Sequence, residues 1–194
     1  MKLILASGSV DRRRLLENIG VKFDVLKTDA EEISFSEDAS MYCKDLAKIK
    51  ADAATSKVTE KAVIIAADTI VYSGGMILEK PKSKEEAIEM IYKMSNGKQE
   101  VWTGVAIYDL YKNKKINFSE KTDIYISNIS KEEAIYYVEN DKDVYNRAGA
   151  YAIDGKNAFF TEKIDGDYAN VIGLPICRIY KELKKLGYEL KDFI

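Results

Sequence analysis

Small side chains and arginines gather near the start of the chain, where a short apolar run ends. Ser7 and Ser9 flank Gly8 directly after this run, and Arg12 follows in a charged segment. A turn of small residues lets the backbone approach a ligand closely, and the start of a helix offers unpaired N–H groups to an anion. An arginine adds a planar fork that suits phosphate oxygens. This pattern predicts a phosphate site at the first turn of the chain.

A second candidate for chemistry is Asp68, which directly follows the aliphatic run 63–67. A carboxylate inside an apolar strand has a high desolvation cost unless other groups compensate for it. One interpretation is structural, with Asp68 at a strand end bonded to backbone N–H groups. The other is functional, as a metal ligand or as a base toward water, and we favour it because titratable groups in apolar surroundings cluster at functional sites.

Lysines and carboxylates elsewhere could complete such a site. Lys50 lies at the border of the apolar face of a predicted helix, where its stem can be buried and its ammonium can turn toward a cleft. When each lysine is considered alone, the simpler interpretation of Lys50 and of Lys80 is a solvated surface charge. Together with Arg12 or Arg13 and the serine-rich turn, they could surround a polyphosphate, whose hydrolysis needs charge neutralisation and positioning. The acidic pair Glu31-Glu32 could join Asp68 in holding a hard divalent metal ion.

The composition excludes several classes of function. The chain of 194 residues has no histidine, which removes Ser-His-Asp and Cys-His nucleophiles, histidine-bearing zinc sites and phosphohistidine chemistry. Any general base must then be Asp, Glu, Lys, Tyr or Cys. With 30 Lys and Arg against 32 Asp and Glu, the net charge of -2 argues against a nucleic-acid partner.

Cysteine usage and hydropathy indicate the compartment. Cys43 and Cys177 form no CxxC motif and no dense disulfide framework, which favours a reducing cytoplasmic location. No apolar run approaches the length of a membrane span, and the first residues lack the pattern of a signal peptide. We therefore expect a cytoplasmic protein with no membrane partner.

The elements that must position these residues alternate between strands and helices. Hydrophobic periodicity and turn signals predict strands over 3–9, 23–26, 63–72, 76–78, 101–111 and 116–126. They predict helices over 11–19, over 39–57 and from Pro175 to 186. Two further helices are predicted to begin with capping boxes, one of Ser83 with Glu86 and one of Ser130 with Glu133 that opens a helix to 139. This order predicts an α/β fold with a mixed sheet, as one domain over 1–194 with two lobes.

Several segments in order resemble the Maf family of nucleotide pyrophosphatases, once described as septum-formation inhibitors. They are LILASGS with the arginines after it, LAKIKA, AADTIV, EKP, WTGV, RAGAYAIDG and GDYANVIGLPI. The resemblance runs through nearly the whole chain, and the order and spacing make it specific. It implies an inosine-triphosphate-pyrophosphatase-like α/β fold, with a curved mixed β-sheet flanked by helices and two lobes around a cleft.

The resemblance also implies a reaction and its residues. The family cleaves a nucleoside triphosphate between the α- and β-phosphates and requires a divalent metal cation, Mg or Mn. Asp68 matches the catalytic proton acceptor, and Glu32 matches an acidic loop residue that binds the metal or water together with Asp68. The phosphate-binding residues of the family match Ser7, Ser9, Arg12, Lys50 and Lys80.

The family branches by the base of its substrate, and three positions are associated with that choice. Arg12 and Thr69 resemble the dTTP/UTP branch, whereas Asp154 stands where that branch usually has glutamine. An amide both donates and accepts hydrogen bonds, but an ionised carboxylate only accepts them. The change could alter how the edge of the base is read.

Three functions follow as hypotheses. The first is hydrolysis of dTTP and UTP, with modified pyrimidine nucleotides included, in a nucleotide-pool house-cleaning role. The second is a pyrophosphatase for methylated or other non-standard nucleotides, and the third is a nucleotide-binding regulator of septum formation. The sequence leaves the oligomeric state open, a homodimer included.

Overall fold

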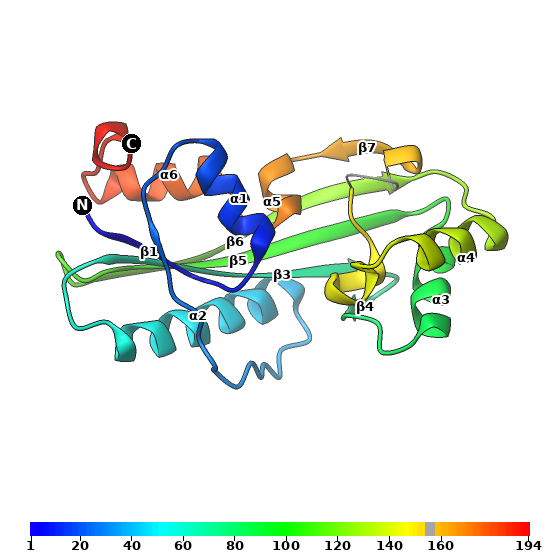
Figure 1. Ribbon diagram of the computed structural model, residues 1–194, viewed down its shortest axis with the longest axis horizontal. Coiled ribbons are helices and arrows are strands. Elements are labelled where there is room, and N and C mark those ends of the chain that lie inside the picture. Colours follow the sequence, from blue (N-terminus) through cyan, green and yellow to red (C-terminus); the bar gives the residue numbers. More distant parts are fainter. Residues whose placement is uncertain (154–157) are drawn as a thin grey trace. The chain divides into compact units, whose positions relative to one another are not determined.

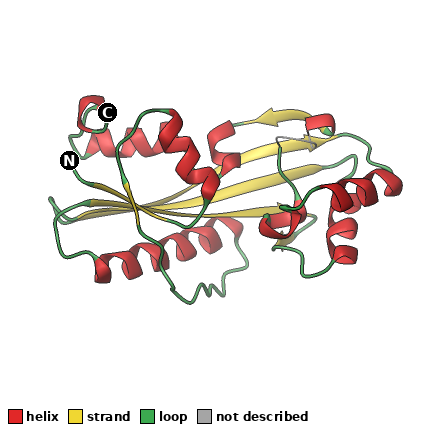
Figure 2. Ribbon diagram, viewed as in Figure 1, coloured by secondary structure: helices red, strands yellow, loops and turns green. Residues whose placement is uncertain are grey.

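The computed structural model describes residues 1–153 and 158–194 of the chain. Asp154, the third residue that we associate with choice of base, lies outside the described residues. Figures 1 and 2 show the helices and strands. In chain order they are β1 (Leu3–Ala6), α1 (Val10–Asn18), β2 (Asp24–Val25), α2 (Ala39–Lys57), β3 (Val63–Ser73), β4 (Met76–Leu78), α3 (Lys84–Met94), β5 (Lys98–Asp109), β6 (Lys114–Ile126), α4 (Lys131–Asn140), η1 (Val144–Asn146), η2 (Ala148–Ala150), β7 (Thr161–Asp165), α5 (Tyr168–Ile172), α6 (Ile176–Lys185) and η4 (Leu190–Asp192).

The strands form one mixed sheet in the order β2-β1-β3-β5-β6-β7, with β4 paired to β3. β1 runs parallel to both β2 and β3, whereas β4 and β7 are antiparallel to their partners. Parallel pairs need a crossover, and the helices α1 and α2 lie in the connections between them. The predicted α/β fold with a mixed sheet flanked by helices is therefore confirmed.

The chain divides into two compact units, in agreement with the two lobes that we expected. The first comprises Met1–Asp68, Thr103–Glu120 and Ile172–Ile194, and the second comprises Thr69–Trp102 and Lys121–Val171. The long strands β3, β5 and β6 contribute residues to both units. Asp68 is the last residue of the first unit along β3.

In the first unit, both faces of the sheet are covered by helices (Figure 1). Ile65 of β3 lies in a core cluster with residues of α1 and α6, while Ile64 and Ala66 lie in another with the alanines of α2. This separation follows from the strand period of two, which sends neighbouring side chains to opposite faces. Asp68 continues the even-numbered series, so its side chain lies on the face that α2 covers.

Helix α2 approaches strand β5 closely at Gly104. A Cβ atom built at Gly104 would lie 2.1 Å from the Cys43 carbonyl oxygen and 2.5 Å from the Lys44 backbone nitrogen. These contacts involve backbone atoms, which cannot move aside as the end of a flexible side chain can. The absence of a side chain at Gly104 therefore sets how near α2 lies to the sheet.

We expect Gly104→Ala to lower the free energy of unfolding by about 3 kcal/mol, because overpacking would displace the α2 backbone. Urea denaturation measures this change. Gly8→Ala is the control, since the three atoms nearest to its Cβ would all belong to the flexible Lys27 side chain, the closest at 3.4 Å. Equal stabilities of the two variants would contradict the close approach.

In the second unit, Ser83 and Ser130 form the N-caps of the two predicted helices. The Glu133 N–H donates to the Ser130 hydroxyl at the start of α4, and the Glu133 side chain completes the predicted capping box. At α3, the Ser83 hydroxyl accepts from the Glu86 N–H. The Glu86 carboxylate accepts from the backbone N–H of Lys82 and not from that of Ser83. The predicted box at Ser83 is therefore only half formed.

The first strand and the segment before the last long helix differ from the prediction. The first strand ends at Ala6 and not at residue 9, because the Ser9 hydroxyl caps α1. Between residue 147 and Pro175, where we predict no helix or strand, the structure contains β7 and α5. Across the residues that the structure describes, no helix combines the length and apolar character needed to cross a membrane.

Candidate active site

The first turn is organised by its two serines. The Ser9 hydroxyl accepts from the Arg12 N–H at 3.4 Å and caps α1, while the Ser7 hydroxyl accepts from the Ser9 N–H at 3.2 Å. Both serines therefore shape the strand-to-helix turn through their own hydrogen bonds. The turn of small residues that the sequence predicts is present, with the α1 N-terminus directly after it.

Arg12 is buried beside this turn, with only 8% of its surface exposed. Its Nε donates to the Gly173 carbonyl oxygen at 2.7 Å, and its Nη1 donates to the Ser7 hydroxyl at 3.2 Å. Burial lowers the pKa of the Arg12 guanidinium, while the charges of Asp68 and Glu32 raise it. The side chain is thus an oriented cation that interacts electrostatically with both carboxylates of the predicted site.

A lysine and two carboxylates form the second part of the site. The Lys50 ammonium lies 2.6 Å from Asp68 Oδ1 and 2.8 Å from Glu32 Oε2. The side chains of Lys50 and Asp68 are 12% and 13% exposed, whereas that of Glu32 is 42% exposed. Lys50 therefore joins a strand carboxylate to one from the loop before α2.

Local periodicity explains how these groups meet. Lys50 follows Ala47 by three residues and precedes Ala54 by four, so it shares the helix face that packs on the sheet. Asp68 lies on the sheet face toward α2, beyond Ala66. The lysine stem can run along the alanine-rich contact and bring its charge to the end of the strand face.

The donor set of this cluster suits a hard divalent cation. Two carboxylates converge on one point, and carboxylate oxygens are preferred ligands of Mg²⁺, which usually retains waters and binds substrate phosphates as well. Within residues 1–153 and 158–194, no three His, Cys, Asp or Glu side chains gather as a complete metal site. A cation at Glu32 and Asp68 would need oxygens from the substrate or solvent.

The structure brings together six of the predicted residues within the first unit. Ser7, Ser9 and Arg12 share the first turn, and Glu32, Lys50 and Asp68 share one ion-pair cluster.

Thr69 and Lys80 belong to the second unit. Thr69 follows Asp68 along the chain. Lys80 is exposed, and the carbonyl of the residue before it, Glu79, accepts from the Gly149 N–H.

One contact of Arg12 was missed from the sequence. The Gly173 carbonyl, which orients Arg12, is 161 residues away along the chain. The Gly173–Pro175 segment was interpreted only as the start of a helix, and periodicity holds no information on so distant a contact. The only indication of a role for Gly173 in the sequence was that it lies in the segment GDYANVIGLPI, which resembles the family.

Cys43 lies in α2 near the cluster but does not take part in it. Burial is the main influence and raises the pKa of the Cys43 thiol to about 12, with the negative charge of Asp68 acting in the same direction. The thiolate is the reactive form of cysteine, so this side chain is a poor nucleophile near neutral pH. The two cysteines are free thiols, with Cys43 buried and Cys177 exposed.

We expect a thiol reagent such as DTNB at pH 8 to modify Cys177 quickly and Cys43 only after unfolding. The protonated Cys43 thiol also stabilises the fold at pH values below the ordinary thiol pKa of about 8.5. That contribution is lost as the pH rises toward about 12, because the unfolded chain ionises first. Rapid modification of both thiols in the folded protein, counted by absorbance, would contradict the burial of Cys43.

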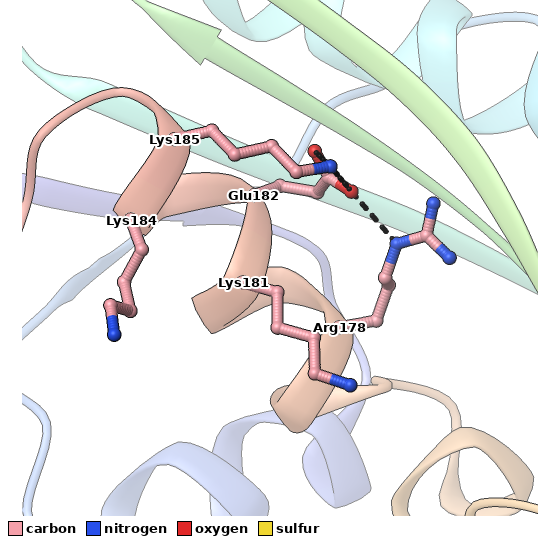
Figure 3. Close-up of a pocket in the computed structure, with 5 residues that line it drawn as sticks. All are labelled: Arg178, Lys181, Glu182, Lys184 and Lys185. Carbon is pink, nitrogen blue, oxygen red and sulfur yellow. Dashed lines mark hydrogen bonds and ion pairs between the residues drawn. The ribbon is translucent and has the colours of Figure 1, made fainter.

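A surface pocket lies elsewhere, on α6 (Figure 3). It is lined by Arg178, Lys181, Glu182, Lys184 and Lys185. Figure 3 shows Glu182 between Arg178 and Lys185, which donate to it at 2.8 and 2.9 Å. Lys185 and Arg178 lower the pKa of Glu182 despite its burial. None of the site residues that we predict lines this pocket, so we do not assign the reaction to it.

The fold and these residues define an α/β protein in which a buried arginine and a largely buried lysine lie near paired carboxylates. The chain belongs to the Maf family, described as Maf-like protein, which matches residues 2–186. The family that the sequence resembles is thus confirmed.

Relatives with printed activities cover nearly the whole chain. A dTTP/UTP pyrophosphatase of Caldanaerobacter subterraneus subsp. tengcongensis is 39% identical, covering 99% of this chain and 96% of the relative. Proteins of the same name from Thermoanaerobacter sp. and Carboxydothermus hydrogenoformans are 40% and 38% identical. They cover 95% and 97% of this chain, and 96% and 100% of the relatives.

Two solved structures are also similar to the chain. The Ham1 protein of Staphylococcus aureus has a TM-score of 0.45 and 15% identity, covering 65% of this chain and 72% of the other. The HAM1 protein of Coxiella burnetii has a TM-score of 0.47 and 12% identity, covering 65% and 73%.

Proposed function

We propose that this protein is a nucleoside triphosphate pyrophosphatase that hydrolyses dTTP and UTP to the monophosphate and pyrophosphate. Membership of the Maf family and near full-length relatives named dTTP/UTP pyrophosphatase support this substrate class. The observation that most supports the proposal is the contact of Lys50 with both Asp68 and Glu32, in which a candidate base meets a largely buried ammonium. The cellular role is removal of nucleotides from the pool.

In the proposed reaction, Asp68 accepts a proton from the attacking water. The oxygen of that water bonds to the α-phosphorus, and the bond from this phosphorus to the oxygen that bridges to the β-phosphate breaks, so that pyrophosphate leaves with that oxygen. Arg12 and Lys50 offset the negative charge of the substrate, which is the main catalytic need in phosphoryl chemistry. The α1 N-terminus behind Ser7 and Ser9 supplies N–H groups for phosphate oxygens.

Glu32 and Asp68 are the residues that would hold the metal ion, Mg²⁺ or Mn²⁺. Their fit rests on the donor set, two carboxylates that meet at one ammonium. When bound, the cation lowers the pKa of water and neutralises phosphate charge. Lys50 keeps the two carboxylates oriented and offsets their mutual repulsion.

Three residues have proposed roles that rest on the family resemblance. Lys80 is a phosphate-binding residue, and Thr69 together with Arg12 contributes to the choice of base. The aspartate at position 154, where the dTTP/UTP branch usually has glutamine, favours one second candidate function, hydrolysis of methylated or other non-standard nucleotides.

The proposed location is the cytoplasm, which the two free thiols support. The oligomeric state is a separate question, because the residues assigned to proton transfer and metal binding come from one chain. Light scattering distinguishes a monomer from the homodimer that the sequence leaves open.

A nucleotide panel tests the proposal. Purified protein is incubated with Mg²⁺ or Mn²⁺ and with dTTP, UTP, CTP, ATP, GTP and 7-methyl-GTP, and both pyrophosphate and orthophosphate are assayed. We expect pyrophosphate from dTTP and UTP at a kcat/KM at least about tenfold above the other nucleotides. A preference for 7-methyl-GTP would support the second function instead. Release of orthophosphate, or no release at all, would refute a pyrophosphatase.

A further inference from the structure

The loop before α2, residues 29–38, leads into that helix (Figure 1), and we call it the acidic strap. Besides the N-cap Asp38, three of its side chains contact side chains of α2 and so tie the strap to the helix. Lys57 lies 3.4 Å from Asp29, and Lys50 lies 2.8 Å from Glu32. The third tie is a hydrogen bond of 3.0 Å, which the Ser34 hydroxyl donates to Asp45 Oδ2. As the strap advances, its partners move back along α2, so the two segments run in opposite directions.

The strap also passes around the helix. Lys57 and Lys50 are seven residues apart and lie on nearly the same side of α2. Asp45 is five residues before Lys50, which places it about 140° around the helix axis. The strap therefore crosses α2 from the side of Asp68 toward the outer side, and the Ser34 tie follows Glu32 by two residues.

The three ties differ in strength. The ion pair of Lys57 with Asp29 is long, and the Asp29 side chain is 94% exposed, so it contributes little. The bond from Ser34 to Asp45 is partly buried and has a charged acceptor, which makes it stronger than a neutral hydrogen bond. The Ser34 hydroxyl also accepts from the Ser36 N–H at 3.3 Å, so one side chain fixes both the strap and its turn.

Glu32 depends on such a tie because its own chain segment has no regular structure. No helix or strand includes residues 26–38. The Glu32 side chain is 42% exposed and could move into solvent at little cost if the backbone beside it were released. The tie at Ser34 restricts that backbone two residues away.

We propose that Ser34 and Asp45 are positioning residues that hold the Glu32 carboxylate at Lys50 and Asp68, and so set the affinity of the site for a divalent cation. This inference rests on the proposed function, in which Glu32 and Asp68 hold the metal ion. Neither residue touches the substrate in this scheme. Their effect passes through the strap to the position of one ligand, as residues behind a metal ligand commonly act.

Direct binding of Mn²⁺ tests this inference apart from turnover. The electron paramagnetic resonance signal of free Mn²⁺ is followed in the presence of dTTP whose α,β-bridging oxygen is replaced by methylene. We expect Ser34→Ala and Asp45→Ala each to weaken Mn²⁺ binding about tenfold. Asp45→Asn should remain within about twofold of the wild type, because its amide oxygen still accepts from Ser34.

Control variants distinguish loss of the hydrogen bond between Ser34 and Asp45 from loss of negative charge and from misfolding. Asp29→Asn alters the weak tie and should leave Mn²⁺ binding unchanged. Hydrogen exchange should become faster within residues 29–38 in Ser34→Ala, while urea unfolding remains cooperative. Weakening by Asp45→Asn equal to that by Asp45→Ala would overturn the proposal, because it would indicate an effect of charge alone.

Glu32→Gln distinguishes failure of the inference from failure of the proposed function. If Glu32→Gln weakens Mn²⁺ binding and Ser34→Ala does not, the positioning role is overturned and the proposed function stands. If Glu32→Gln binds Mn²⁺ as the wild type does, the assigned metal site is wrong and the positioning role falls with it.

Discussion

Asp68→Asn should reduce pyrophosphate release from dTTP and UTP by about 10³-fold while leaving the fold intact. Asparagine has nearly the shape of aspartate, but it cannot take a proton from water. Loss of a general base commonly costs about 10²- to 10⁴-fold in rate. The amide oxygen can still accept from Lys50, which lies 2.6 Å from the Asp68 carboxylate, so stability should fall by only about 1 kcal/mol.

The measurements are kcat from a coupled pyrophosphate assay and the free energy of unfolding in urea. Asp24→Asn is the matched control, because Asp24 is an exposed carboxylate of β2 that also pairs with a lysine, Lys2. It should retain the wild-type kcat. Turnover by Asp68→Asn above about one tenth of the wild-type value would remove the role of proton acceptor from Asp68.

Lys50→Met should impair both stability and catalysis. Methionine retains an apolar stem among the alanines of α2 and removes the charge that joins Glu32 and Asp68. The side chain of Asp68 is 13% exposed, so its carboxylate would be left largely desolvated and without this cation. Removing one partner of such a pair should lower the free energy of unfolding by about 2–3 kcal/mol. The kcat should fall about 10²-fold, as for loss of one preorganised charge.

Lys48→Met is the control for this change, because Lys48 lies in the same helix and forms an exposed ion pair with Asp52 at 3.4 Å. It should cost less than about 0.5 kcal/mol and leave kcat unchanged. The double variant of Lys50→Met and Asp68→Asn should be little slower than Asp68→Asn alone, because the two residues act as one unit. Equal behaviour of Lys50→Met and Lys48→Met would show that Lys50 has no special role.

Local patterns were enough to predict the elements that frame the site. The aliphatic run before Asp68 forms β3, and the helical spacing of 39–57 forms α2 with those bounds. These patterns are reliable because burial of one helix face requires apolar residues at helical spacing, whereas burial of both faces of a strand requires an unbroken apolar run. The short elements β7 and α5 were missed, because β7 exists through its pairing with β6.

The same periods assign each site residue to a face of its own element. Residues 64, 66 and 68 share one face of β3, and Lys50 shares one face of α2 with the alanines that flank it. Asp68 could be chosen as a candidate from the pattern of its own strand, since a carboxylate after five aliphatic residues is unusual. Lys50, considered singly, was indistinguishable from a solvated surface lysine.

Packing of α2 on the sheet is what joins Lys50 to Asp68 and excludes the surface interpretation of that lysine. The same holds for Arg12, whose guanidinium is oriented by Gly173 from the far end of the chain. Residue types and spacing specify which groups are able to do chemistry and which way each faces along its helix or strand. They do not specify which faces meet, because that depends on how distant segments bury their apolar surfaces against one another.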